Sequence, residues 1–369
     1  MGNVPHLRFP EFSGEWQKCK LGDLCNVLMC KRILASQTNT EDGVPFYKIG
    51  TIGSTPDAYI SKELFDDYKV KYNYPRKGEV MITCAGTVGK CVVYDGEDAY
   101  FQDSNIVWID NPTQYISNGF LFHLLSKVDW RKLNSTTIIR IYNDDLRNLK
   151  MSYPQKEEQQ KISHLLSLLD ERITTQNKII EDLKKLKSAI SERLFKSVKG
   201  STVLLSDLCD IVKGKQINGE NLSDSGNYYV MNGGTEPSGY YDNYNVEANT
   251  ISISEGGNSC GYVQFNTSPF WSGGHCYSIQ NIADKVDNMY LYHYLKSNED
   301  AIMKLRIGSG LPNIQKKDLA MFKIIVPKIE RQITISTFLS SLERKAEIEE
   351  RILNVMQKQK LYLLQQMFI

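Results

Sequence analysis

The stretch YPQKEEQQKISHLLSLLD at residues 153–170 returns as VPKIERQITISTFLSSLE at residues 326–343. The two copies lie 173 residues apart (326 − 153), which is nearly half of the 369-residue chain. Upstream of them, LGDLCNVLMCKRI at residues 21–33 returns as LSDLCDIVKGKQI at residues 205–217. Solenoid repeats are roughly 20 to 50 residues long, so a repeat of this length indicates two whole domains, each with its own core.

Each repeated stretch opens a long amphipathic helix. From about Lys156 to Phe195, and again from about Lys328 to Phe368, apolar residues recur at alternating steps of three and four, without a glycine or proline. We expect Pro154 and Pro327 to start these helices, because proline is tolerated in the first helical turn. The predicted seam for helix pairing consists of Ile162, Leu169, Ile173, Ile180, Leu183, Ile190, Leu342, Leu353, Met356 and Leu363.

A leucine stripe on one shorter helix more often packs into the core of its own domain. Here the length, the repetition and the charged opposite faces favour two helices that pack as an antiparallel coiled coil. Leu186 also falls on the stripe, and the stripe is interrupted at Gln176 and Glu349.

Residues 16–150 and 201–326 differ from the helices in their local pattern. Short runs rich in Val, Ile and Tyr, such as VPFYKIG and NTISISEGG, are bounded by Gly, Asn or Asp, which is typical of strands. We expect a mainly antiparallel, curved sheet in each segment, followed by a short helix near Phe120–Lys127 and Tyr290–Lys296.

The predicted fold class is therefore α+β, with two pseudo-repeated, mainly-β domains separated by two long helices. The predicted boundaries are 1–153 for the first mainly-β domain, 154–199 for the first long helix, 200–326 for the second mainly-β domain, and 327–369 for the second long helix.

The composition is that of an ordinary soluble protein, with 41% hydrophobic and 24% charged residues and a net charge of +1. No apolar run approaches the roughly 18 to 20 residues that a membrane span needs, and the N-terminus lacks a signal-peptide pattern. The eight cysteines include no C-x-x-C pair, which favours reduced thiols in a cytoplasmic protein.

The chain offers little that indicates catalysis. A methyltransferase motif of the Asn-Pro-Pro-aromatic type is interrupted by Thr113 in NPTQY at residues 111–115, and there is no glycine-rich cofactor loop after a strand. The histidines have no metal-binding spacing, and the repeated His123 and His293 on apolar helices favour packing over ligation. We predict no catalytic residues, no metal site and no cofactor bound by this chain.

Candidate recognition residues lie in the loops between the strands. Short polar side chains read donors and acceptors on base edges, and arginine pairs with guanine O6 and N7. Any one of these residues could equally belong to an ordinary turn or be a solvated surface charge. The candidates are Lys31, Thr51, Ser54, Thr87, Lys90, Arg140, Asn143, Lys215, Asn232, Thr235, Asn258, Arg306, Ser309 and Asn313.

In its order of motifs the chain resembles the specificity subunit of type I restriction–modification systems. The resemblance rests on VPHLRFPEFSGEW at the start, KLGDL at 20–24, LSDL at 205–208, and two P-x-x-E-x-Q-x-x-I helix starts at Pro154 and Pro327. It covers nearly the whole chain.

The resemblance implies a DNA-binding, non-catalytic subunit of a methyltransferase and endonuclease complex that defends the cell against foreign DNA. Each recognition domain would read one half of a bipartite, asymmetric site in double-stranded DNA, and the helices would set the spacing and dock two modification subunits. Adenine methylation with S-adenosylmethionine would belong to those subunits. ATP, Mg²⁺ and DNA cleavage would belong to restriction subunits, with no role for a membrane.

Two other functions remain open from the residues alone. The β domains could bind protein, which would make the chain an assembly scaffold that does not bind DNA. Less favoured by the motifs is a degenerate DNA methyltransferase.

Overall fold

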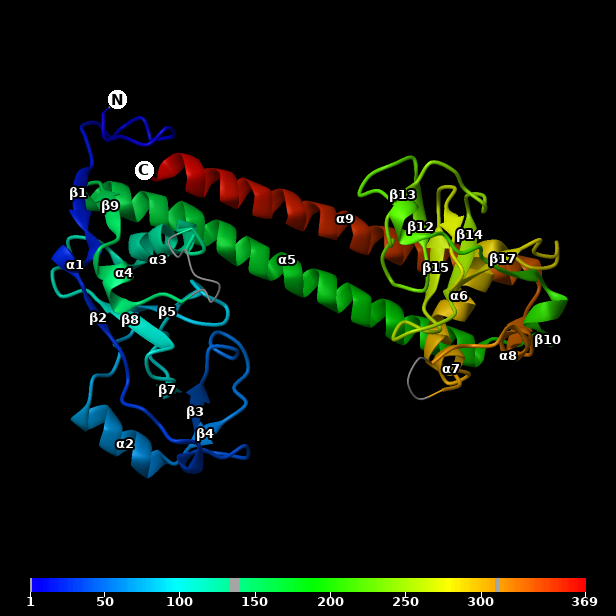
Figure 1. Cartoon of the computed structure of the whole chain (residues 1–369), viewed down its shortest axis with the longest axis horizontal. Helices are drawn as coiled ribbons and strands as arrows, with labels where there is room; N and C mark the ends of the chain where they lie inside the picture. Colours follow the sequence, from blue (N-terminus) through cyan, green and yellow to red (C-terminus); the bar gives the residue numbers. More distant parts are fainter. Residues whose placement is uncertain (1, 133–139, 309–311) are drawn as a thin grey trace. The chain divides into compact units, whose positions relative to one another are not determined.

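The computed structural model describes residues 2–132, 140–308 and 312–369, and it divides into two compact units (Figure 1). The first unit runs to Gln176 and includes Ile352–Ile369, and the second comprises Asn177–Arg351. Each unit therefore contains one β-rich domain and one half of each long helix.

In its described residues, the domain of the first unit is built of three small sheets and four short α-helices. Strand β8 lies inside an antiparallel sheet of order β2-β8-β5-β6, a second sheet has the order β4-β3-β7, and β1 pairs with β9. The elements are β1 Gln17–Lys20, α1 Leu21–Leu24, β2 Asn26–Leu28, β3 Val44–Tyr47, β4 Tyr59–Ile60, α2 Lys62–Lys71, β5 Val80–Thr83, β6 Cys91–Val93, β7 Tyr100–Phe101, β8 Ile106–Asp110, α3 Asn118–Lys127, α4 Asn143–Arg147 and β9 Lys150–Tyr153, with a 3-10 turn at Ala35–Gln37.

The second unit repeats this plan, with sheets of order β11-β17-β14-β15 and β13-β12-β16 and a β10–β18 pair. The ten-residue helix α2 of the first unit has no counterpart among the described residues between β13 and β14. The elements are β10 Ser201–Leu204, β11 Asp210–Lys213, β12 Tyr228–Met231, β13 Tyr240–Tyr241, β14 Thr250–Ser254, β15 Val263–Asn266, β16 Trp271–Ser272, β17 Cys276–Gln280, α6 Asn288–Ser297, α7 Glu299–Met303, α8 Lys316–Ala320 and β18 Lys323–Val326, with 3-10 turns at Leu205–Asp207 and Gly219–Asn221.

The prediction of strands and short helices is confirmed, but one curved sheet per domain was wrong. In each unit one predicted strand, β3 or β12, leaves the four-stranded sheet and pairs in parallel with a two-residue strand, β7 or β16. This split encloses a separate apolar cluster around Phe46 and Tyr100 in the first unit and around Met231 and Phe270 in the second.

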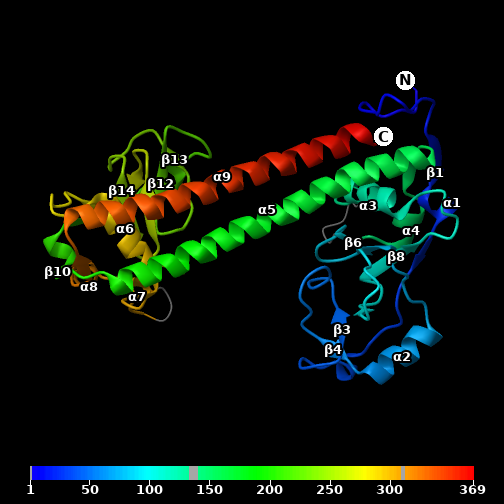
Figure 2. The ribbon, with the colours of Figure 1, turned by 180° about the vertical axis from the view of Figure 1, so that it is seen from behind.

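The two long helices are α5, Lys156–Ser197, and α9, Ile329–Met367. Both begin two residues after the predicted proline. In the second unit Lys184 pairs with Glu350 and Lys187 with Glu343, each at 2.6 Å, so the residue numbers rise on α5 as they fall on α9. In the first unit Asp170 pairs with Lys360. Each unit thus holds an antiparallel pair of half-helices, side by side in both views (Figures 1 and 2).

The predicted seam residues are all buried or half-buried. Leu186 was placed on this stripe wrongly, because its side chain is 51% exposed. Lys187 takes the position instead, and its ammonium is neutralised by Glu343. A long lysine stem can cover apolar surface while its charged end pairs at the edge.

A repeated glutamine ties each helix start to its domain. Gln159 and Gln332 are fully buried. Each donates to the carbonyl of the proline five residues earlier, Pro154 at 2.8 Å and Pro327 at 2.9 Å. Each also accepts from the backbone NH of an N-cap residue of the preceding domain. Gln159 accepts from Ser117, which caps α3, at 2.7 Å, and Gln332 accepts from Asp287, which caps α6, at 2.8 Å.

A repeated histidine makes a second tie further along. His123 Nε2 lies 3.4 Å from Ser167 Oγ on α5, and His293 Nε2 lies 2.8 Å from Ser340 Oγ on α9. Burial lowers the pKa of both imidazoles to about 4, because a charged ring would lose its hydration there. Both rings are therefore neutral at neutral pH, as the packing interpretation expected.

These two pKa values predict acid sensitivity. The unfolded chain takes up protons on both rings below about pH 6.5 while the folded chain stays neutral until about pH 4, so stability falls as the pH is lowered through this window, by about 3 kcal/mol per ring at most. In urea unfolding at pH 7.5 and pH 4.5, the double variant His123→Gln, His293→Gln should lose less stability on acidification than the wild type. The exposed His275→Gln is the matched control. An equal loss in wild type and double variant would contradict this assignment.

Candidate nucleic-acid interface

In the first unit, the predicted loops meet at the edge where β5 ends and β8 begins. The backbone NH of Ile141 donates to the carbonyl of Cys84 at 2.9 Å, which joins the segment after residue 139 to the loop that follows β5. The Lys90 ammonium donates to the carbonyl of Ile52 at 2.5 Å, which joins that loop to the loop after β3. Three of the predicted loops therefore form one surface.

The candidate side chains on this surface differ in their contacts within the chain and in their exposure to solvent. Arg140 Nη2 lies 3.4 Å from both the carbonyl and the hydroxyl of Ser104, and its guanidinium lies 5.9 Å from the Tyr142 ring centroid. The hydroxyl of Thr51 accepts from the NH of Lys48 at 3.0 Å, so it stabilises a turn. The Lys31 ammonium lies 5.4 Å from the ring centroid of Tyr72. Ser54 and Thr87 are exposed, and Asn143 begins α4.

The second unit brings its candidates to the matching edge, where β14 ends and β17 begins. The NH of Ile314 donates to the carbonyl of Glu255 at 2.8 Å, and the NH of Glu255 donates to the carbonyl of His275 at 2.9 Å. Asn232 Oδ1 accepts from the NH of His275 at 3.1 Å. The loops after β11, β12, β14 and β16 and the segment before α8 thus converge.

Five of the second unit's candidates keep exposed or half-exposed side chains at this edge, and they are Lys215, Thr235, Asn258, Arg306 and Asn313. Asn232 is half-buried by its contact with His275. Ser309 lies outside the described residues.

The two candidate arginines, Arg140 and Arg306, do not occupy equivalent positions of the repeat. Ile141 and Ile314 make the same backbone bond to the residue that follows β5 or β14, so Arg140 corresponds to Asn313. Arg306 lies seven residues before Asn313 and next to the Ile307–Asn313 bridge. Two similar-looking arginine segments therefore stand at different places in the repeat.

Sequence reasoning missed a charged cluster in the second unit. Glu255, only 6% exposed, accepts from the Lys213 ammonium at 2.6 Å and from the Tyr277 hydroxyl at 3.0 Å, with His275 beside it. The repeated stretches that begin at residues 21 and 205 lie 184 residues apart (205 − 21), which aligns Lys213 with Met29. This change from methionine to lysine could have indicated the cluster from the sequence.

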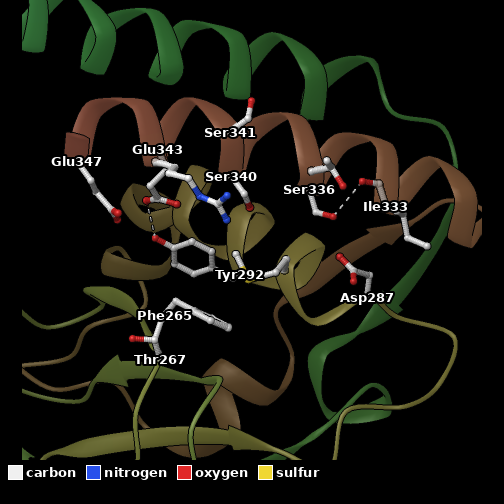
Figure 3. Close-up of a pocket in the computed structure, with 13 residues that line it drawn as sticks. Phe265, Thr267, Asp287, Tyr292, Ile333, Ser336, Ser340, Ser341, Glu343 and Glu347 are labelled. Atoms are coloured by element: carbon white, nitrogen blue, oxygen red, sulfur yellow. Dashed lines mark hydrogen bonds between the residues drawn. The ribbon is translucent and has the colours of Figure 1, made fainter. Parts of the chain in front are cut away.

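A pocket between α6 and α9 in the second unit contains many hydroxyls and carboxylates (Figure 3). Several of its polar side chains already make hydrogen bonds within the chain. Glu343 accepts from the Tyr292 hydroxyl at 3.0 Å, Ser340 contacts His293, and Ser336 donates to the carbonyl of Ile333 at 3.2 Å. This arrangement rigidifies the contact between α6 and α9.

All eight cysteines are free thiols, and six of them are buried. Burial raises the pKa of Cys25 and of Cys209 to about 12, so these thiols stay protonated and unreactive. Among the described residues no group of His, Cys, Asp and Glu is arranged to hold a metal ion. Within that same part of the chain, no helix combines the length and the apolar character of a membrane span.

Known proteins resemble this chain over part or nearly all of its length. A specificity subunit of a type I restriction enzyme from Haemophilus influenzae is 50% identical over 164 residues, which cover 44% of this chain and 42% of that relative. A specificity subunit from Methanocaldococcus jannaschii is 23% identical over 95% of this chain and 92% of its own length.

Solved structures show the same fold. The S subunit of a type I restriction–modification system from M. genitalium superposes with a TM-score of 0.69 at 18% identity, covering 99% of each chain. A structure concerned with the assembly of a type I system superposes with a TM-score of 0.58 at 16% identity, covering 98% of each chain.

The family model for the type I restriction modification DNA specificity domain matches residues 13–185 and again residues 199–358. The two matches cover both units and most of both long helices. The chain therefore belongs to the family of type I restriction–modification DNA specificity subunits, with two copies of its domain.

Proposed function

We propose that each unit of this specificity subunit reads one half of a bipartite, asymmetric site in double-stranded DNA. The observation that carries the proposal is that one sheet edge recurs in both units with different side chains. Arg140 stands in the first unit where Asn313 stands in the second, and Met29 stands where Lys213 stands. Arginine and asparagine prefer different base edges, so the two units would prefer different sequences.

The long helices would set the distance between the half-sites and dock two methyltransferase subunits. The predicted seam is occupied within the chain, so docking would fall on other positions. In the second unit the exposed large apolar residues of the two helices are Ile179, Leu186, Ile329, Ile333, Phe338 and Ile348, and in the first they are Leu168, Ile352, Val355, Leu361 and Tyr362. Apolar residues exposed along a helix pair favour association with further helices.

Geometry separates this apolar stripe from the ion pairs. Two residues along a helix turn it by about 200°. Leu186 therefore lies on the opposite flank of the seam from Lys184, which pairs with Glu350. A partner that packs on the Leu186 flank would leave the ion pair intact.

Other activities would come from the partners in a cytoplasmic complex. The docked subunits would methylate adenine with S-adenosylmethionine, and restriction subunits would use ATP and Mg²⁺ to move along DNA and cleave it. The chain's near-zero net charge fits such sharing, because non-specific DNA affinity comes from Lys and Arg that displace counterions.

Exchange of domains tests the reading function. Replacing residues 16–150 with the corresponding segment of another specificity subunit should change one half of the methylated sequence and leave the other half and the spacing unchanged. Sequencing of methylated DNA from cells that also make the modification subunit measures this. An unchanged methylated sequence would favour the assembly scaffold. Labelling of DNA by the purified chain alone with S-adenosylmethionine would favour a degenerate methyltransferase.

Two neighbouring leucines test the docking surface. Leu186→Glu should leave the melting temperature within about 2 °C of the wild type and reduce co-purification of the modification subunit at least several-fold. Leu183→Glu, on the half-buried seam, should instead lower the melting temperature, because it places a charge between the two helices. Full co-purification with Leu186→Glu would remove this flank from the docking surface.

A further inference from the structure

The Glu255 carboxylate is buried at the edge where β14 ends and β17 begins, and only one of its two oxygens is hydrogen-bonded in the described part of the chain. Oε1 accepts from both the Lys213 ammonium, at 2.6 Å, and the Tyr277 hydroxyl, at 3.0 Å. Oε2 has no hydrogen-bond partner in the described part of the chain. An unsatisfied buried carboxylate oxygen destabilises a fold, so such a group is retained where a ligand supplies the missing donor.

Two exposed side chains, His275 and Lys213, flank the Glu255 carboxylate. The His275 imidazole stands over it with Nδ1 3.6 Å away, which is too long for a hydrogen bond. That side chain is 64% exposed, so it can rotate aside. The Lys213 side chain is 51% exposed and keeps further N–H donors beyond the one that Glu255 uses.

We infer that the Glu255–Lys213 pair reads a single C·G base pair in the major groove of the half-site bound by the second unit. This inference rests on the proposed DNA-reading function. In the major groove cytosine presents only its N4 amino donor, which suits the free carboxylate oxygen. Its partner guanine presents the acceptors O6 and N7, which suit the ammonium of Lys213.

The same chemistry rejects the other bases. Thymine O4 and guanine O6 and N7 are acceptors and would face the carboxylate with like partial charge. Adenine offers an N6 donor beside the N7 acceptor, so it would match only in part. The Tyr277 hydroxyl holds Oε1 and leaves Oε2 as the reading atom, which makes Tyr277 a positioning residue.

The first unit lacks this pair. At the corresponding positions it has Cys84, which follows β5 as Glu255 follows β14, and Met29 in place of Lys213. The reading is therefore specific to the second half-site. The first half-site serves as an internal control in every experiment.

The experiment uses the assembled complex of this chain with its modification subunit. Methylation rates are measured on duplexes in which each base pair of both half-sites is changed in turn. For Glu255→Gln we expect discrimination at one C·G pair of the second half-site to fall at least about 10-fold, with adenine gaining there, because glutamine matches adenine N6 and N7. The exposed Glu247→Gln is the matched control and should change nothing.

Lys213→Met, which installs the residue found in the first unit, should relax preference at the same base pair. If Glu255→Gln fails to fold, the Lys213→Met variant tests the inference on its own. Unchanged preference in the folded variants, or an equal loss at every position of both half-sites, would overturn the inference. If the exchange of residues 16–150 still alters one half-site, the inference alone has failed, and if that exchange alters none, the proposed function has failed.

Discussion

Everything in this fold depends on two apolar heptad seams that pack against each other in antiparallel order. In each unit α5 and α9 lie side by side, and the ion pairs Lys187–Glu343 and Asp170–Lys360 join them. Their ends enter the two domain cores, where Ile162 and Met367 join the first and Phe195 and Ile335 join the second. The seam is apolar and ion pairs lie beside it, and the side of α5 that carries Leu186 and Ile179 is exposed.

The repeated polar ties make each domain rigid on its helix. Gln159 and Gln332 fix the helix starts to the loops before α3 and α6, and the neutral His123 and His293 fix the bodies of those short helices. Buried hydrogen bonds of this kind specify one arrangement better than apolar packing does, because a shifted arrangement would leave buried donors and acceptors unpaired. These bonds fix the orientation of each β-rich domain relative to the half-helix to which it is bonded.

Much of this architecture could be predicted because the sequence contains long apolar periodicities and an internal repeat. The helices, the principal strands and the doubling all have such patterns. The parallel pairs β3–β7 and β12–β16 could not be predicted, since a two-residue strand has no periodicity. Lys187 was missed on the seam because a lysine interrupts the apolar pattern, although its charge is neutralised across the seam by Glu343.

The recognition edge was predicted less well than the fold. The loops that form it were identified, because small polar residues and glycines mark them. Which side chains point outward depends on tertiary contacts that no local pattern shows, such as those of Arg140 with Ser104 and of Asn232 with His275. The buried Glu255 resembled an ordinary turn residue until Lys213 and Tyr277 were found beside it.

The central claim is that two similar units read two different sequences at a fixed separation. Sequencing of methylated DNA from cells that make this chain with its modification subunit tests it most directly. The account predicts one site of two unlike parts separated by a constant number of unread base pairs. A palindromic site, or one uninterrupted sequence, would contradict it.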